Sequence, residues 1–188
     1  MQDAVRPLAI APPEPVREDL SPEARLRTLF DGQFDFVWRS LRRLGVPELT
    51  VDDATQEVFL VVSRRLGDIE PGRERSFLFA TALRVASTAR RAAARRGIHD
   101  DAEVAQLVDH APGPEELADR KRARDVLDRV LATLELDLRA VFVLYELEEM
   151  TMAEIAITLE LPPGTVASRL RRAREAFEAA AAELRGRS

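Results

Sequence analysis

Apolar side chains recur at three- and four-residue steps along most of this 188-residue chain, which is the spacing of one face of an α-helix. The segment between Pro22 and Gly45 shows the pattern at these positions: Leu26, Phe30, Phe34, Val37, Trp38 and Leu41. No stretch of useful length alternates apolar and polar residues, as a half-buried strand does. The sequence therefore predicts an all-α protein.

Charge divides these helical segments into two blocks. Residues 98–118 carry six acidic residues and no Arg or Lys. Residues 23–97 carry 14 arginines against 10 acidic residues, and residues 119–188 carry 12 basic against 13 acidic residues. The net charge of −5 thus hides two mixed-charge blocks separated by a purely acidic segment.

We expect two small helical domains joined by a flexible acidic linker. The expected parts are a flexible, proline-rich tail at 1–21, a first domain at 22–97, the linker at 98–113 and a second domain at 114–188. A block of about 75 residues buries only about 60% of its unfolded surface, so each domain is marginally stable by itself.

Two segments have the form of a capping box, in which Thr caps a helix and an acidic residue follows three positions later. They are Thr50–Asp53 and Thr151–Glu154. We expect a helix to start at each, and we expect Gly45 and Pro47 to end the helix before the first.

The second capping box opens a helix-turn-helix pattern: a short capped helix, the turn Pro162-Pro163-Gly164 and a longer arginine-rich helix. Helical spacing places these residues of the last helix inward: Val166, Leu170, Ala173 and Phe177. It places these outward: Ser168, Arg171, Arg172 and Glu175. A recognition helix in the major groove needs this division, although a surface helix with a solvated arginine face shows it too.

A second arginine cluster lies in the helix expected from about Glu74 to Arg96. Its members are Arg84, Arg90, Arg91, Arg95 and Arg96. Such a cluster suits a phosphate track, and a solvated charged face is the alternative.

Composition speaks against catalysis. The chain has no cysteine and two histidines, which excludes thiol chemistry and cysteine-based metal sites. Carboxylates at Asp52, Asp53 and Glu57 fit helix capping or a docking surface, since no phosphate loop or histidine accompanies them. We therefore expect no enzyme activity, no metal and no cofactor.

Apolar runs are far shorter than the roughly 20 residues of a membrane helix, so we expect a cytoplasmic protein without membrane insertion.

Three segments in this order resemble the extracytoplasmic-function (ECF) group of bacterial RNA polymerase sigma factors. DDATQEVFLVVSRRL is similar to the family's region 2 helix, with matches at Asp53, Gln56, Glu57, Val58 and Phe59. RSFLFATALRVASTARR is similar to the next helix, although Arg84 replaces an Asn and Thr88 an Asp of the family pattern. MTMAEIAITLELPPGTVASRLRRAREAF is similar to the region 4 signature E-I-A-x-x-L…G-T-V-x-S-R-L-x-R-A-R.

The resemblance implies a promoter-specificity subunit whose partners are core RNA polymerase, promoter DNA and an anti-sigma factor. It implies core binding by Asp53, Gln56, Glu57 and Phe59. It implies contacts with the −10 element by Arg84, Thr88, Arg91 and Arg95. It implies contacts with the −35 element by Thr165, Ser168, Arg169, Arg171, Arg172 and Arg174. A flipped base would be held by the loop at 67–75.

Other function classes stay open from the residues alone. A stand-alone helix-turn-helix regulator would use the last helix in the same way, but it has no need of the DDATQEVF helix. A helical interaction module would fit the negative net charge, but it leaves both arginine faces unexplained.

Overall fold

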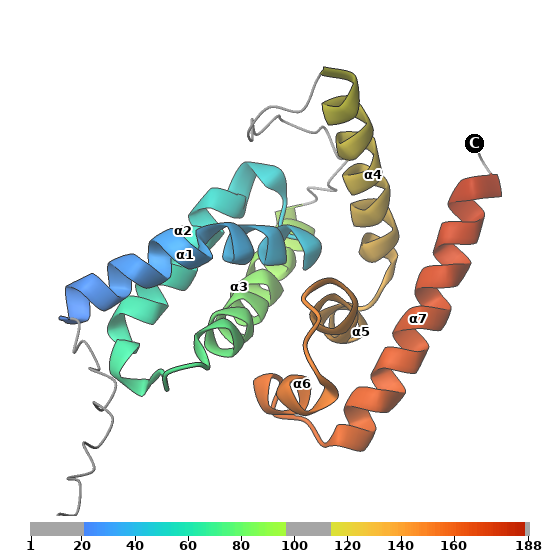
Figure 1. Cartoon of the computed structure of the whole chain (residues 1–188). Coiled ribbons are helices and arrows are strands. Elements are labelled where there is room, and N and C mark those ends of the chain that lie inside the picture. Colours follow the sequence, from blue (N-terminus) through green and yellow to red (C-terminus); the bar gives the residue numbers. More distant parts are fainter. Residues whose placement is uncertain (1–20, 97–113, 187–188) are drawn as a thin grey trace, which may run out of the picture.

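The computed structural model describes residues 21–96 and 114–186, and all regular structure within them is helical, as predicted (Figure 1). The helices are α1 Pro22–Arg43, α2 Glu48–Arg64, α3 Glu74–Arg96, α4 Pro114–Thr133, α5 Leu136–Phe142, α6 Met152–Thr158 and α7 Pro163–Gly186. A 3-10 turn at Leu66–Asp68 follows α2, and a π-helical turn at Val143–Leu147 continues α5.

The tail predicted at 1–21 lies outside the described residues except for Ser21, and so does the linker predicted at 98–113.

The first helix begins and ends as the sequence predicts. The Ser21 hydroxyl accepts a hydrogen bond from the Ala24 amide at 3.3 Å, and Pro22 occupies the first helical turn. After Leu44 the chain turns at Gly45, whose φ of +89° is a conformation that glycine adopts without steric cost.

The second helix starts three residues earlier than predicted, and the capping box predicted at Thr50 is wrong. Pro47 precedes the helix with a φ of −57°, which suits a helix start, and no side chain caps that end. Thr50 therefore lies within the first turn, where its hydroxyl donates to the Pro47 carbonyl at 3.2 Å.

Helices α1, α2 and α3 pack against one another around a shared apolar core. Among its fully buried members are Val37, Leu41, Val58, Leu78 and Phe79. Each comes from the apolar stripe of its helix, so the helical period alone determines which face of each helix points inward.

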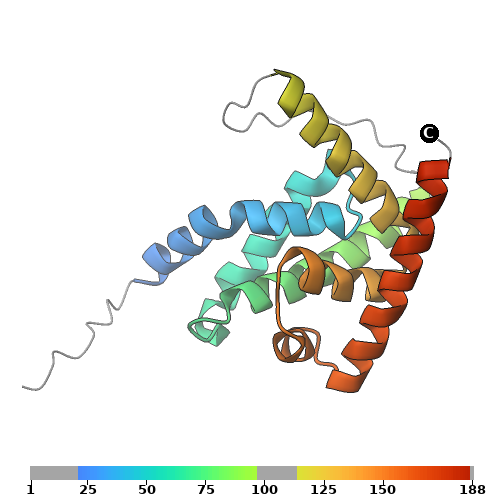
Figure 2. The ribbon, with the colours of Figure 1, turned by 45° about the vertical axis from the view of Figure 1, so that its right-hand side comes forward.

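Helices α4 to α7 form a second group that lies against the first, with α5 and α6 beside α3 (Figures 1 and 2). Helix α7 packs on α5, α4 and α6. Buried residues of both groups belong to one continuous hydrophobic cluster, so the two helical blocks of the sequence are in contact.

Candidate nucleic-acid interface

The predicted helix-turn-helix is formed by α6 and α7. Thr151 caps α6 in a complete capping box: its hydroxyl accepts from the Glu154 amide at 3.3 Å, and the Glu154 carboxylate accepts from the Thr151 amide at 2.8 Å. This confirms the second capping box. In the turn, the Leu161 amide donates to the Ala156 carbonyl at 2.9 Å, which closes the end of α6.

The inward face of α7 is the one predicted from helical spacing. Val166, Leu170 and Ala173 are buried, and Phe177 is partly buried. The Phe177 ring stacks on Phe142 of α5 with 4.6 Å between ring centroids. These contacts hold α7 firmly and leave its opposite face to solvent.

The outward face of α7 carries one uncommitted guanidinium group. Arg171 forms an ion pair with Glu175 at 2.6 Å, one turn along the helix. Arg172 is exposed and has no ion-pair partner among the residues that the structure describes. Ser168 and Thr165 lie on the same half of the helix, and the Ser168 hydroxyl donates to the Thr165 carbonyl at 2.9 Å. An exposed Arg172 is free to make two parallel hydrogen bonds to a guanine or a phosphate.

Two other predicted DNA contacts on α7 are instead bound to the protein itself. Arg169 forms an ion pair with Asp137 of α5 at 2.9 Å. Arg174 donates to Glu146 at 2.6 Å and lies over the Tyr145 ring at 5.1 Å. The hydrogen bond with Glu146 is the main cause that raises the pKa of Arg174 above its usual value. Both arginines therefore attach α7, one to α5 and the other to the π-helical turn that continues α5.

The arginine face of α3 contacts the second helical group through an ion pair of Arg84. Arg84 lies 3.8 Å from Glu160, in the turn between α6 and α7, and 65% of its side chain is exposed. Thr88 and Arg91 are exposed on the same helix, and each donates to a backbone carbonyl one turn earlier. Arg95 lies in the last turn of α3.

Arg90 belongs to a different environment from the other arginines of α3. Its guanidinium donates to the Leu44 carbonyl at 3.4 Å, and burial lowers its pKa. It therefore packs at the end of α1 and does not extend the exposed face.

The exposed face of α2 carries the predicted polymerase contacts Asp53, Gln56 and Glu57. Phe59 is only 6% exposed, and its ring lies 4.8 Å from that of Phe30. The direct contact predicted for Phe59 is therefore corrected: its ring lies in the core and supports the face from below.

Sequence reasoning missed three exposed apolar residues around this face. Leu49 is 94% exposed, Leu60 is 51% exposed and Phe30 is 42% exposed. Leu49 and Leu60 lie off the buried stripe of α2, which is their signal in the sequence, whereas Phe30 was predicted on the apolar stripe of the first helix and is nevertheless partly exposed. We call the exposed side chains of Leu49, Asp53, Gln56, Glu57 and Leu60 the α2 docking surface.

The loop at 67–75, predicted to hold a flipped base, is fastened by Arg25 of α1. Its guanidinium donates to the carbonyls of Leu66 and Ile69, at 3.2 and 2.5 Å. Sequence reasoning missed Arg25, because nothing near it in sequence indicates a partner more than 40 residues away.

Across residues 21–96 and 114–186 there is no group of three metal-ligating side chains. A helix that is long and apolar enough to cross a membrane is likewise missing from those ranges.

Comparison with known proteins identifies the family. The sequence model of the family described as Sigma-70, region 4 matches residues 124–177. The ECF RNA polymerase sigma-E factor of Escherichia coli K12 is 30% identical over 142 residues, which cover 71% of this chain and 74% of that protein. The ECF sigma factor SigE of Mycolicibacterium smegmatis is 31% identical over 144 residues, 75% of this chain and 55% of that protein.

Solved structures share the arrangement of helices. CnrH, in complex with the cytosolic domain of CnrY, superposes with a TM-score of 0.60 at 26% identity, over 84% of this chain and 87% of CnrH. RpoE of Bartonella quintana, in complex with the anti-sigma factor NepR, superposes with a TM-score of 0.58 at 20% identity, over 81% of this chain and 96% of RpoE. The second likeness shows the fold alone. The predicted resemblance is thus confirmed, and the chain belongs to the ECF group of RNA polymerase sigma factors, the promoter-specificity subunits of bacterial transcription.

Proposed function

We propose that this sigma factor works through three surfaces: the α2 docking surface, the arginine face of α3 and the outward face of α7. One observation carries the proposal: the same chain has a complete helix-turn-helix with an exposed Arg172, unpaired among the described residues, and, on another helix, the exposed α2 docking surface. A protein that only bound DNA would have no use for the second feature.

The α2 docking surface is the proposed contact with core RNA polymerase. It combines two exposed leucines with the carboxylates of Asp53 and Glu57. Apolar area supplies affinity, and the carboxylates select a basic partner surface and orient it. Phe59 keeps α2 in place through its contacts with Phe30 and Phe34.

The α3 face is the proposed reader of the −10 element, with Arg84, Thr88, Arg91 and Arg95 as its contacts. The α7 face is the proposed reader of the −35 element. There, contacts to DNA come from Thr165, Ser168, Arg171 and Arg172. Arg169 and Arg174 hold α7 at the correct angle through their ion pairs with Asp137 and Glu146.

The proposed division of the chain is a region 2-like domain at 22–97 and a region 4-like domain at 114–188. The match to Sigma-70 region 4 at 124–177 falls within the second domain and supports this division.

We propose that the protein acts in the cytoplasm as a regulatory subunit without a cofactor. Core RNA polymerase carries out RNA synthesis. An anti-sigma factor is a further proposed partner, in line with the complex in which the similarly folded RpoE was solved.

The test is a pull-down with bacterial core RNA polymerase, followed by run-off transcription on a pool of genomic promoters. We expect stable binding to core and a small set of selected transcripts. Glu57→Arg reverses a charge in the α2 docking surface and is expected to weaken core binding by at least about tenfold, as for a close charge pair at an interface. Glu183→Arg makes the same change at an exposed position near the end of α7 and serves as the matched control.

The opposite outcome has a specific meaning. If core polymerase does not bind while duplex DNA is bound tightly by the protein alone, the chain acts as a stand-alone helix-turn-helix regulator. Equal core binding by Glu57→Arg and Glu183→Arg would move the polymerase contact away from α2.

A further inference from the structure

One buried carboxylate joins the two helical groups. Glu148 lies directly after the π-helical turn that continues α5, and its side chain is 5% exposed. It accepts one hydrogen bond from Arg43 of α1 at 2.5 Å and another from Arg75 of α3 at 2.7 Å. Both arginines come from the first group, so Glu148 ties two of its helices to the second.

Removing this carboxylate would leave its partners in a poor environment. Burial lowers the pKa of Arg43, and the nearby charge of Glu148 partly offsets that effect. Arg75 also lies over the Phe36 ring at 4.3 Å, so it is held against α1. Removing Glu148 is costly chiefly at Arg43, whose side chain is 21% exposed, because its charge would stay largely buried without this partner.

A second buried charge at the same interface, that of Arg139, destabilises the contact between the two helical groups. Arg139 of α5 is 2% exposed and reaches the turn at Gly45 so closely that a Cβ atom there would lie 2.4 Å from its Nη1. One of its amino groups donates to the Leu134 carbonyl at 3.2 Å, while its Nε has no partner. No ion pair of Arg139 occurs among the described residues, and burial together with the charge of Arg90 lowers its pKa to about 10.

Separating the two groups would relieve Arg139. Gly45 and Arg90 both belong to the first group, so opening the interface brings water to the guanidinium and removes a like charge from its surroundings. Glu148 therefore stabilises the contact between the two helical groups, and Arg139 destabilises it. Arg139 lies in α5, and Glu148 follows the π-helical turn that continues α5.

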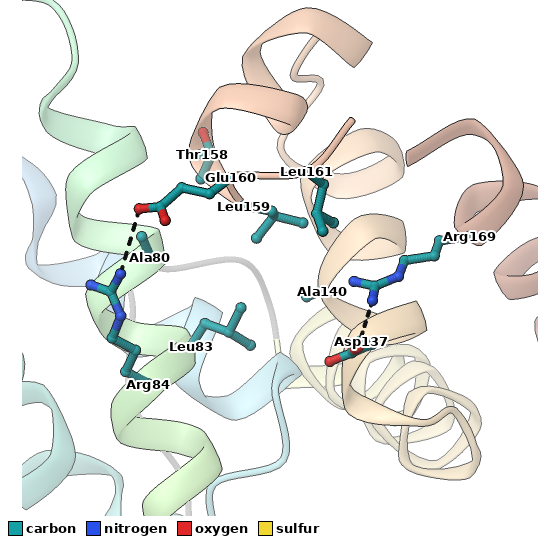
Figure 3. Close-up of a pocket in the computed structure, with 10 residues that line it drawn as sticks. All are labelled: Ala80, Leu83, Arg84, Asp137, Ala140, Thr158, Leu159, Glu160, Leu161 and Arg169. Atoms are coloured by element: carbon teal, nitrogen blue, oxygen red, sulfur yellow. Dashed lines mark ion pairs between the residues drawn. The ribbon is translucent and has the colours of Figure 1, made fainter. Parts of the chain in front are cut away.

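The closed interface also contains Arg84, one of the proposed −10 contacts, and Arg169, which attaches the recognition helix α7 to α5. Arg84 and Arg169 line one cavity of about 190 Å³, where Arg84 pairs with Glu160 and Arg169 pairs with Asp137 (Figure 3). The two promoter elements are centred about 25 base pairs apart, which is about 85 Å at 3.4 Å per base pair. Because residues of α3 and α7 line one small cavity, the closed chain cannot place the α3 face and the α7 face on both elements at once.

We propose that the free chain rests in a closed state that cannot span both promoter elements, held shut by the Glu148 clamp and kept easy to open by the buried Arg139 charge. The consequence for promoter binding rests on the proposed function, because it concerns the faces assigned to promoter DNA. The closed state and its two opposing contacts concern the free protein alone.

The test uses fluorescence energy transfer within the full chain. Because the sequence has no cysteine, Gly32→Cys on α1 and Ala179→Cys on α7 give two specific labelling positions. A Cβ at Gly32 meets nothing within 4 Å, and Ala179 is exposed. In this background we expect Glu148→Gln to raise the ratio of open to closed molecules at least about tenfold. We expect Arg75→Gln to shift it in the same direction by less.

Two further variants make the test specific. Arg139→Met removes the buried charge and is expected to shift the labelled protein further toward the closed state. Glu149→Gln changes the exposed neighbour of Glu148, which has no ion pair among the described residues, and is expected to leave the transfer unchanged.

The outcomes separate this proposal from the proposed function. Equal transfer in the Glu148→Gln, Arg75→Gln and Glu149→Gln proteins would overturn the clamp, and it would do so without any use of polymerase or DNA. If Glu148→Gln fails to fold by circular dichroism, Arg75→Gln decides the matter alone, because its side chain is 51% exposed and its loss leaves the Arg43 contact in place. A failed core pull-down with the expected transfer changes would overturn the function and leave the clamp standing.

Discussion

The first helical group, α1 to α3, and the second, α4 to α7, each contain an arginine-rich helix, and the two helices use their arginines differently. In α7 the ion pairs of Arg169 and Arg174 attach the helix to the α5 segment, and Arg172 remains free. In α3 the attachment to the rest of the fold is mainly apolar, through fully buried side chains such as Leu78 and Phe79. The comparison teaches that an arginine count does not measure the DNA-binding capacity of a helix, because part of it goes into holding the helix in place.

The two groups also differ in their Thr-x-x-acid segments. At Thr151 the capping box is complete, whereas at Thr50 the preceding proline starts the helix and the threonine turns back to bond the Pro47 carbonyl. The same four-residue pattern therefore has two outcomes, and at Thr50 a proline three positions earlier decides against the cap.

The largest expected effect tests the apolar attachment of α3. Phe79→Ala removes a fully buried ring and is expected to lower the free energy of unfolding by about 3–5 kcal/mol. Phe177→Ala removes a partly buried ring of α7 and is expected to cost about 1–3 kcal/mol. Urea denaturation followed by circular dichroism measures both. Equal losses would contradict the picture of a central α3 and a peripheral α7.

The next effect tests the free arginine of α7. Arg172→Ala is expected to weaken promoter binding by about 1–3 kcal/mol, because a bidentate contact to a base is lost, while the free energy of unfolding stays unchanged. Fluorescence anisotropy with a promoter obtained from run-off transcription measures it. Arg185→Ala, at an exposed position near the end of the same helix, is the control. Unchanged promoter selection by the Arg172 variant would refute the assigned role.

A smaller effect separates the two Thr-x-x-acid segments. Thr151→Ala is expected to lower the free energy of unfolding by about 1 kcal/mol, since it removes a helix cap. Thr50→Ala is expected to cost less than about 0.5 kcal/mol, because no cap is present there. The two variants are compared by thermal unfolding under the same conditions, and a larger loss at Thr50 would reverse the assignment.

The smallest effect is a dependence of the α6 cap on pH. Hydrogen bonds with the side chain and then the backbone of Thr151 lower the pKa of Glu154, so the folded cap holds its proton less tightly than the unfolded chain does. The stability that follows is present above the ordinary pKa of a glutamate and is lost as the pH falls through the lower folded value. Amide exchange at Ile155 between about pH 6 and pH 2 follows this loss.

Two variants check the origin of that dependence. Glu154→Gln is expected to flatten the response of Ile155, because the amide keeps the hydrogen bond without a titrating group. Glu178→Gln, on the exposed part of α7, is expected to leave the response as it is. The same response in all three proteins would exclude Glu154 as its source.

Much of the local structure could be predicted because it depends on neighbours in sequence. The inward face of α7, the cap at Thr151 and the end of α1 at Gly45 all follow from helical spacing or from one residue's conformational preference. The predicted start of α2 was wrong by three residues, because a proline at the boundary overrode the expected threonine cap.

The candidate sites were predictable only in part. Spacing indicates which side chains of a helix lie outward, but it says nothing about which of them meet a partner from elsewhere in the chain. Phe59 carries a family signature and nevertheless lies in the core, and Arg169 and Arg174 are bound to carboxylates about 30 residues earlier in sequence.

By itself the sequence determined the helices, their apolar faces and the family, since these depend on periodicity and on short motifs that a linear reading contains. Tertiary structure alone decided how the two helical groups meet. Glu148 reaches Arg43 across 105 residues, and Arg139 reaches the turn at Gly45 across a similar span. Such contacts depend on the packing of whole helices and not on any local pattern, so no spacing in the sequence predicts them.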